Sequence, residues 1–271
     1  MKKITLFTLL CGIVMGTASC SLFELDNYDA PAETLRGKVV DVKTGAPVLT
    51  DQGSEGIRVR LTETSWEGNT NPLDFYCRPD GTFQNTKIFD AEYNVRIDGP
   101  FIPIVREASD GSLIYDGSVN TRIKGETELT FEVEPFLNVE IVDIPSASSG
   151  KVTAKVRVTR GVDVDTFRSK IEPMGDYDES FVNVTDIQLF VSYSKSVGYR
   201  ARDDRWSSKI EYPGNSFEAN LGEEVEITSI GSIPSGRKVF VRAAARINYD
   251  TPRGSGTRRW NYSEAMEVTV P

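Results

Sequence analysis

The sequence predicts an all-β protein of two tandem antiparallel β-sandwich domains, preceded by an export segment and a short tether. Three observations lead to this fold class. Short stretches of alternating apolar and polar residues recur along the chain, clusters of turn-forming residues separate them, and only one short stretch has a helical repeat. The length of 271 residues exceeds the roughly 100 residues of one sandwich, so we expect two domains.

An N-terminal export signal occupies residues 1–19. Two lysines follow the initiating methionine, an apolar run over residues 4–14 is too short to cross a bilayer, and small residues precede Cys20. The sequence Ala18-Ser19-Cys20 resembles the cleavage site of lipoprotein signals, which implies that Cys20 carries lipid. The alternative is an ordinary signal peptide that is cut after Ala18 or Ser19 and leaves an incidental cysteine.

The lipidated cysteine and a tether occupy residues 20–33. The tether is acidic, and Pro31 interrupts regular structure. With acidic residues soon after the cysteine, the tether resembles the surface-export signal of Bacteroidetes lipoproteins. This resemblance implies an outer-membrane protein at the cell surface, with outer-membrane lipid as its partner through Cys20. A solvated spacer between bilayer and domain explains the same residues equally well.

Composition and charge exclude several classes of function. The chain has 31 basic and 40 acidic residues and a net charge of −9, so it lacks the basic surface that nucleic acid binding requires. It contains no histidine, which rules out Ser-His-Asp and Cys-His catalysis and histidine-ligated metal sites. We therefore predict no nucleic acid partner. Asp176-Tyr177-Asp178 begins the ligand pattern of a calcium loop, but the glycine of its sharp turn is missing, so we also predict no metal site and no cofactor.

The first domain is predicted over residues 34–135. Leu35, Gly37 and Val39 occupy every second position, which is the period of a strand with one buried face. Pro79-Asp80-Gly81 marks a turn. Further strand-like stretches are at residues 57–62, 82–83, 93–98 and 127–133. Several short strands at regular spacing indicate an antiparallel sandwich.

Four motifs in this region resemble the carboxypeptidase-regulatory-like domain. They are G-K-V-V-D at residues 37–41, T-G-A-P at 44–47, D-G-T-F at 80–83 and A-E-Y-N-V at 91–95. The resemblance covers residues 33–135 and implies a transthyretin-like sandwich that is non-catalytic and serves as a module or binding platform. Ala91 departs from the pattern of that family, in which glycine is common at this position.

Cys77 is expected to be a free thiol in or beside a strand of this domain. Apart from the cysteine of the signal peptide, the chain has only Cys20 and Cys77. Lipid on Cys20 would leave Cys77 without a partner for a disulfide. The domain must then be stable through its core alone.

The second domain is predicted over residues 136–271. Strand-like stretches are at residues 137–142, 152–158, 187–193, 225–227, 239–243 and 268–270. Between the second and third of these, a brief helix is predicted within residues 162–171. There Val164, Phe167 and Ile171 share one face, and a proline follows the segment.

The end of the chain resembles a fibronectin type III domain. Residues 233–245 are similar to the penultimate strand of that domain, and residues 262–270 to its last strand. The corner tyrosine of the family would fall near Val239, where this chain has no tyrosine. The resemblance therefore implies the class of an immunoglobulin-like sandwich and not the family name.

Taken over its whole length, the chain resembles a Bacteroidetes surface-lipoprotein family, a domain of unknown function. Its members have the regulatory-like domain first and an immunoglobulin- or fibronectin-III-like sandwich second. Residues 24–41 and 75–86 carry this resemblance. Members are encoded beside outer-membrane importers and glycan-binding lipoproteins of the starch-utilisation type. The resemblance therefore implies a role in polysaccharide uptake.

Acidic residues cluster in three polar segments, at residues 163–165, 176–179 and 203–204. A retaining glycosidase needs two carboxyl groups about 5–5.5 Å apart across a cleft, one of them with a raised pKa. Adjacent acids in polar loops have neither a wall nor a cleft around them. We therefore predict solvated charges at these places and no enzyme activity.

Three pairs of aromatic residues are the candidate glycan contacts, because sugar rings stack on aromatic faces through their apolar C–H groups. The pairs are Trp66 and Tyr76, Trp206 and Tyr212, and Trp260 and Tyr262. The last two pairs lie in or beside polar loops, whose backbones we expect at the surface. The alternative is that the tryptophans pack over the ends or edges of the sandwiches.

Two arginine groups, at residues 200–205 and 253–259, also have two interpretations. They bind an anionic sugar or the acidic groups of a partner, or they balance neighbouring aspartates. Balance by nearby acids is the more common role of such groups.

The predicted function is an accessory one without catalysis. The protein binds glycan, or supports an outer-membrane importer complex, as part of a polysaccharide-uptake system. The alternative is a structural or protein-interaction module of an outer-membrane complex with no small ligand. Exposed aromatic residues in a concave patch would favour glycan binding, whereas a flat apolar patch of several hundred Å² would favour the interaction module.

Overall fold

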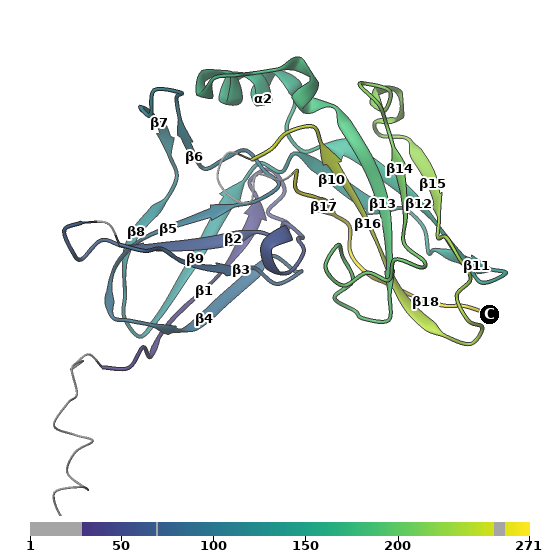
Figure 1. Ribbon diagram of the computed structural model, residues 1–271, viewed down its shortest axis with the longest axis horizontal. Helices are drawn as coiled ribbons and strands as arrows, with labels where there is room; N and C mark the ends of the chain where they lie inside the picture. Colours follow the sequence, from purple (N-terminus) through teal and green to yellow (C-terminus); the bar gives the residue numbers. More distant parts are fainter. Residues whose placement is uncertain (1–28, 69, 252–257) are drawn as a thin grey trace, which may run out of the picture.

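The computed structural model describes residues 29–68, 70–251 and 258–271, which form two β-sandwiches side by side (Figure 1). The all-β class predicted from the alternating pattern is confirmed. The predicted signal peptide and the Cys20 anchor lie outside the described residues. In the described part of the chain, no helix has both the length and the apolar character to span a membrane.

The first sandwich has two sheets and a separate hairpin (Figure 1). Its strands are β1 (Glu33–Asp41), β2 (Arg58–Glu63), β3 (Leu73–Tyr76), β4 (Thr82–Ile88), β5 (Ala91–Asp98), β6 (Val105–Glu107), β7 (Leu113–Asp116), β8 (Val119–Ile123) and β9 (Glu126–Val133), with a 3-10 turn η1 (Gly53–Glu55) before β2. One sheet has the order β4-β1-β9 and the other β3-β2-β5-β8, while β6 pairs with β7.

The first core forms from the alternation in the sequence. In β5, every second residue from Ala91 to Ile97 is buried, and those between are half-buried or exposed. Side chains from both sheets, among them Leu35, Val59 and Phe83, meet in one cluster. Burying such side chains stabilises the domain by about 1.5–3 kcal/mol for each large apolar residue.

β1 is an interior strand, with β4 on one side and β9 on the other. Its pairing with β4 is antiparallel, as predicted, but its pairing with β9 is parallel from Thr34 to Asp41. The sheet leaves no room for a side chain at Gly37, where a Cβ would lie 2.1 Å from the Leu129 carbonyl oxygen and 2.4 Å from the Phe83 ring. Glycine is therefore required there.

Cys77 directly follows β3 and is a buried free thiol among the described residues, which confirms its predicted position beside a strand. Burial raises the pKa of the Cys77 thiol to about 12, because the thiolate would lose its hydration, and the nearby Asp80 charge acts in the same direction. The thiol therefore stays protonated at neutral pH and packs in the first core.

The second sandwich also has two sheets (Figure 1). Its strands are β10 (Leu137–Ile141), β11 (Ser146–Ser148), β12 (Lys151–Arg160), β13 (Val184–Ser192), β14 (Ser208–Glu211), β15 (Glu224–Thr228), β16 (Lys238–Ile247), β17 (Asn261–Tyr262) and β18 (Met266–Thr269), with 3-10 turns η2 (Glu172–Met174), η3 (Glu179–Val182) and η4 (Glu218–Asn220). One sheet has the order β10-β12-β11 with β15 on β12. The other has the order β14-β13-β16-β17 with β18 on β16.

The predicted helix is present as α2 (Val164–Ile171). Asp163 caps its N-terminus by accepting a hydrogen bond from the Thr166 backbone N–H at 2.8 Å. Phe167 and Ile171 are buried in the second core, as their spacing predicted. The helix covers the end of the sandwich that lies nearest to the β6–β7 hairpin (Figure 1).

A third apolar cluster joins the two sandwiches. Strands β13 and β16 bury both faces, because one face lines the second core and the other faces the first domain. The cluster comprises Phe190, Val197, Ala244, Trp260 and Tyr262, with Leu49 of the first domain, Phe240 and Ala265 packed against it. We call this contact, together with the polar side chains of Asp51, Arg242, Arg259 and Asn261, the domain seam.

Arg242 on β16 is the central cation of the domain seam and is 3% exposed. Its guanidinium donates across the seam to the carbonyl oxygens of Thr50 at 2.8 Å and Pro79 at 3.2 Å. It also donates to the Ser263 carbonyl oxygen at 2.7 Å. Burial lowers the pKa of Arg242, and the neighbouring Tyr262 and other acidic groups oppose that shift. Backbone carbonyls from both domains therefore hold this charge in place.

Asp51 of the first domain supplies the buried carboxylate of the domain seam. One carboxylate oxygen accepts hydrogen bonds from the Arg200 backbone N–H at 3.0 Å and the Tyr262 hydroxyl at 3.2 Å. The other accepts from the Gln52 backbone N–H at 2.8 Å. Burial raises the pKa of Tyr262 well above its usual value, and the Asp51 charge adds to that effect. The tyrosine therefore acts as a neutral donor.

Arg259 and Asn261 extend the polar contact along the domain seam. The Arg259 guanidinium donates to the Gly56 carbonyl oxygen and, at 3.1 Å, to the Asp98 carbonyl oxygen. The Asn261 amide donates to the Pro100 carbonyl oxygen at 3.0 Å. Because hydrogen bonds are directional, these contacts fix the orientation of one sandwich on the other.

Candidate functional site

Trp206 and Tyr212 pack against the second core. Trp206 is 3% exposed, its indole N–H donates to the Ser232 carbonyl oxygen at 3.2 Å, and Tyr193 meets it edge-on with ring centroids 5.0 Å apart. Tyr212 is half-buried and lies 4.8 Å from Phe217 between ring centroids. The polar residues before Trp206 form a turn that folds the indole inward. The prediction of Trp206 as a glycan contact is wrong, and Tyr212 is engaged with the core.

Trp260 and Tyr262 lie in the domain seam, where they are 2% and 5% exposed. The Trp260 ring packs edge-on against Phe190, with centroids 5.9 Å apart, and Arg246 lies 4.4 Å from its centroid. Tyr262 stacks on the same Phe190 at 5.9 Å. Docking of the two domains covers both rings, so neither is available to a sugar. Their assignment as glycan contacts is therefore also wrong.

Trp66 and Tyr76 are exposed, at 59% and 37%, but they do not form a joint platform. The register of the β2–β3 hairpin places Tyr76 opposite Arg58, at the far end from the loop. Trp66 lies beyond the other end, where its indole N–H donates to a Glu63 carboxylate oxygen at 2.8 Å. Two separate exposed rings give a sugar one stacking face each.

The acidic clusters have structural partners. Asp163 caps α2, Asp178 caps η3 through the Ser180 backbone N–H at 2.7 Å, and Asp203 pairs with Arg205 at 2.6 Å. Hydrogen bonds from these partners lower the pKa of all three carboxyl groups. A general acid needs the opposite shift. Within the described residues, no group of three or more acidic or cysteine side chains is placed to hold a metal ion.

The described part of the arginine groups follows the balancing interpretation. Arg202 pairs with Asp204 at 2.6 Å, Arg205 pairs with Asp203, and Arg258 lies 3.9 Å from Asp250. Arg259 is buried in the domain seam, where it donates to the Asp98 carbonyl oxygen. Arg253 lies outside the described residues. These side chains are therefore committed to neighbours.

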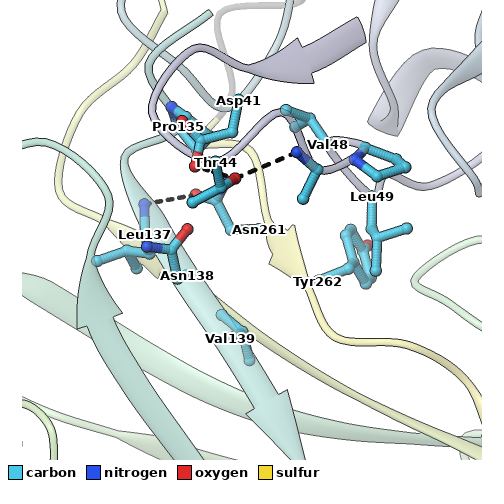
Figure 2. A pocket seen from close by; sticks show the side chains of 12 residues that line it. Asp41, Thr44, Val48, Leu49, Pro135, Leu137, Asn138, Val139, Asn261 and Tyr262 are labelled. Atoms are coloured by element: carbon cyan, nitrogen blue, oxygen red, sulfur yellow. Dashed lines mark hydrogen bonds between the residues drawn. The ribbon is translucent and has the colours of Figure 1, made fainter. Parts of the chain in front are cut away.

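Clefts open where the two sandwiches meet, and Figure 2 shows one of them between the loop after β1 and strands β10 and β17. It encloses about 280 Å³. Some of its polar groups bind one another: Asp41 accepts from the Thr44 hydroxyl at 3.0 Å, and the Asn261 side-chain amide oxygen accepts from the Leu137 backbone N–H at 3.3 Å. These contacts use part of the hydrogen-bonding capacity of the cleft, while Asn138 lines it from an exposed position on β10.

A second cleft, of about 440 Å³, lies beside Arg242 on another side of the domain seam. Arg78, Lys195 and Glu264 line it with mixed charge, and none of the described residues in its wall is aromatic. The Arg242 guanidinium in this wall already donates to backbone carbonyls. This cleft lacks a stacking surface for a sugar.

A third cleft, of about 460 Å³, lies beside the β6–β7 hairpin, and we call it the hairpin cleft. Its lining residues come from both domains: Val42, Ile102, Pro103, Ile104, Arg106, Tyr115, Glu132, Val133, Glu134 and Lys170. The hairpin stands next to α2, which contributes Lys170 (Figure 1). The volume lies within the range of roughly 300–1,000 Å³ that is typical of small-ligand sites.

Tyr115 is the aromatic residue of the hairpin cleft, and half of its surface is exposed. It lies directly opposite Arg106 in the register of β6 and β7, and the Arg106 Cζ atom is 4.6 Å from the centroid of its ring. A guanidinium at this distance from a ring is held by cation–π attraction. The hairpin therefore presents an aromatic ring and a cation side by side.

Charged groups from both domains flank the ring. Lys170 of α2 forms an ion pair with Glu134, which follows β9, and both side chains are partly exposed. Loss of hydration lowers the pKa of Arg106, while Tyr115 and Glu134 oppose that shift. A half-exposed ring with cations, carboxylates and aliphatic side chains around it can stack on a sugar and hydrogen-bond to its hydroxyl groups.

Sequence reasoning missed this cleft, although one signal was present. Residues 113–116 read L-I-Y-D, so three apolar residues stand in a row where a half-buried strand would alternate. The structure exposes all four of them in β7. Contiguous exposed apolar patches often mark binding surfaces, so this stretch was a signal for one.

Similarity to known proteins is limited to solved structures, since no family model and no curated protein matches the chain. A DUF3823 family protein from Bacteroides uniformis is 67% identical, with a TM-score of 0.86, and the match covers 89% of this chain and 100% of that one. A candidate carbohydrate binding protein from the same species is 18% identical with a TM-score of 0.61, and the coverage is again 89% and 100%. A DUF3823 family protein from Parabacteroides merdae is also 18% identical, with a TM-score of 0.60 and the same coverage.

Proposed function

Since the chain belongs to the DUF3823 family, we propose that it is a non-catalytic outer-membrane lipoprotein that binds glycan as an accessory component of a polysaccharide-uptake system. A protein of the same fold is described as a candidate carbohydrate binding protein, but at 18% identity it shares only the fold. For this chain the proposal rests on the hairpin cleft.

The observation that carries the proposal is the half-exposed ring of Tyr115 in a cleft of about 460 Å³. An aromatic ring that faces a cleft gives the apolar face of a sugar a stacking surface, and the surrounding charged groups supply partners for hydroxyl groups. Tyr115 is a better candidate than Trp66, because Tyr115 lines a cleft whereas Trp66 is exposed in a loop. Glycan binding is therefore assigned to the hairpin cleft.

The carboxyl groups support the non-catalytic part of the proposal. Each aspartate or glutamate whose pKa is clearly shifted in the described part of the chain has a lowered pKa; these are Asp74, Asp80, Asp90, Asp110, Asp116, Asp163, Asp178, Asp186 and Asp203. A glycosidase acid is protonated at working pH and needs a raised pKa. Binding without hydrolysis is the role that these groups favour.

Tyr115→Ala should weaken glycan binding by about 5- to 150-fold, because a stacked ring contributes about 1–3 kcal/mol. The ligand is first identified on a glycan array with the chain from Ser21 onward, which keeps all described residues. Affinities of the wild type and variant are then measured by calorimetry. Tyr115→Phe keeps the ring and should retain most of the affinity.

Trp66→Ala is the matched control, since it removes a more exposed ring from the same domain. It should leave both the melting temperature and the glycan affinity unchanged. If Tyr115→Ala binds as tightly as the wild type, the hairpin cleft is not the site. If Trp66→Ala loses affinity in its place, the binding site is the β2–β3 loop.

The location in the outer membrane rests on the lipoprotein signal of the sequence. Cys20→Ala should release the protein into the periplasm or the medium, because a protein without its acyl chains has no anchor. Cell fractionation with radiolabelled palmitate measures both properties. A variant that remains in the outer-membrane fraction and still takes up palmitate would contradict the anchor at Cys20.

A protein-interaction module is the second candidate function, and the outer surface of the hairpin favours it. Leu113 is 59% exposed and Ile114 40%, and they adjoin Tyr115 in sequence. Exposed apolar residues on a two-stranded hairpin are a docking surface for another protein. Absence of any glycan ligand from the array, together with a partner that binds the wild type but not a Leu113→Ser/Ile114→Ser variant, would favour this function.

A further inference from the structure

Among the described residues of the hairpin cleft, Arg106 is a cation without a carboxylate partner. Lys170 and Glu134 form an ion pair, so these two charges compensate each other. Glu132 lines the cleft from an exposed position on β9. Within the described residues, Arg106 forms no ion pair, and its Nε atom is buried without a hydrogen-bond partner.

The position of Arg106 comes from its contact with Tyr115. Its Cζ atom lies 4.6 Å from the ring centroid, so cation–π attraction orients the guanidinium. No described residue accepts a hydrogen bond from its buried Nε atom. This differs from Arg242 and Arg259, whose guanidinium groups donate to backbone carbonyls of the domain seam. The pKa of Arg106 is lowered, chiefly because burial removes part of the hydration of its guanidinium.

A planar guanidinium with free donors matches a carboxylate, because two parallel N–H groups meet the two carboxylate oxygens. The ring beside it matches the apolar face of a sugar. A sugar that offers both features is a uronic acid, in which the carboxylate replaces the exocyclic hydroxymethyl group. Since Nε is buried, the pairing is end-on through the two Nη groups.

Building on the glycan-binding function proposed above, we infer that the hairpin cleft selects uronate-bearing glycans: Tyr115 packs on the sugar ring while the two Arg106 Nη groups bind its carboxylate. The Glu132 carboxylate at the cleft rim repels an anionic ligand. The preference for an acidic sugar over a neutral one therefore depends on Arg106. Removing that guanidinium should abolish the preference for the acid without abolishing the stacking contact.

The test uses uronate-bearing polysaccharides, each paired with its carboxyl-reduced form, in which the carboxylate has become a neutral hydroxymethyl group. Calorimetry on the chain from Ser21 onward should show tighter binding of the acidic form. Arg106→Gln should weaken binding of the acidic form by about 10- to 150-fold, the loss expected for a charge-assisted hydrogen bond, and leave the reduced form unaffected. Arg106→Lys keeps the positive charge but loses the two parallel N–H donors of the guanidinium. It should therefore bind the acidic form more tightly than Arg106→Gln but less tightly than the wild type.

Arg157→Gln is the control for net charge, since this arginine pairs with Glu140 and Glu224 on the surface of the second sandwich. It should bind every ligand as the wild type does. Equal binding of acidic and reduced forms would overturn the uronate assignment and leave glycan binding intact. Arg106-dependent binding of sulfated, uronate-free glycans alone would also overturn it. Failure of every glycan, neutral or acidic, would remove the proposed function as well.

Discussion

Arg242→Met is expected to destabilise the folded protein by about 3–5 kcal/mol, the usual cost of removing one member of a buried charge group. The variant keeps an unbranched apolar side chain and loses the guanidinium. The carbonyl oxygens of Thr50, Pro79 and Ser263 then lack their donor, and Asp51 loses the cation that faces it across the domain seam. Equilibrium unfolding in urea, followed by tryptophan fluorescence, measures the change.

The matched control for this prediction is Arg157→Met. Arg157 forms two ion pairs at the surface, with Glu140 at 2.7 Å and Glu224 at 3.0 Å. Exposed pairs contribute about 0–1 kcal/mol, so the control should unfold close to the wild type. An Arg242→Met variant as stable as this control would show that the domain seam does not hold the sandwiches together.

Trp206→Ala should lower the free energy of unfolding by about 3–5 kcal/mol, the range for removing a large buried aromatic side chain. The indole is 3% exposed, and it donates to the Ser232 carbonyl oxygen, which would be left without a partner. Trp260→Ala should cost a similar amount through the domain seam, where the ring packs between Phe190 and Arg246.

Thermal melts of the two variants beside Trp66→Ala test this expectation. Trp66 is 59% exposed, so its removal should change stability by no more than about 0.5 kcal/mol. If Trp206→Ala and Trp260→Ala melt with the wild type, both rings are more accessible than the structure places them. Their assignment as glycan contacts would then be open again.

The strands and the helix could be predicted because their signals are local. Alternation at every second residue records which face of a strand is buried, and the spacing of Phe167 and Ile171 does the same for α2. The direction in which two strands pair is not recorded by alternation. The parallel pairing of β1 with β9 was therefore missed, since either direction buries the same side chains.

The domain seam could not be predicted from the sequence. A polar loop composition indicates irregular backbone, but it does not indicate whether another domain covers the loop. Trp260 follows a polar segment, yet docking of the first domain buries its ring. A signal for this docking was present in β16, where Ala243, Ala244 and Ala245 are consecutive and buried. A strand that is apolar on both faces needs a partner on both faces.

The hairpin cleft could be predicted least of all. Its polar groups come from Arg106, Glu134 and Lys170, which are brought together only when α2 of the second sandwich meets the first domain. No motif joins positions so far apart along the chain. Only the exposed apolar stretch around Tyr115 was visible in advance, as an interruption of the strand pattern.

The interior position of β1 has a consequence for how the protein reaches its native state. β1 is made first and β9 much later: Arg36 hydrogen-bonds to Glu128, 92 residues further along the chain. During synthesis β1 can pair with β4, but its other edge stays open until β9 has been made.

Contacts of such long sequence separation slow folding, because the loop between them must close before the pairing is gained. The first sandwich therefore passes through a period in which an apolar strand with an unpaired edge is available to other chains. We expect refolding yields to fall as protein concentration rises, and nascent chains that end before Glu126 to depend on chaperones that bind unfolded segments.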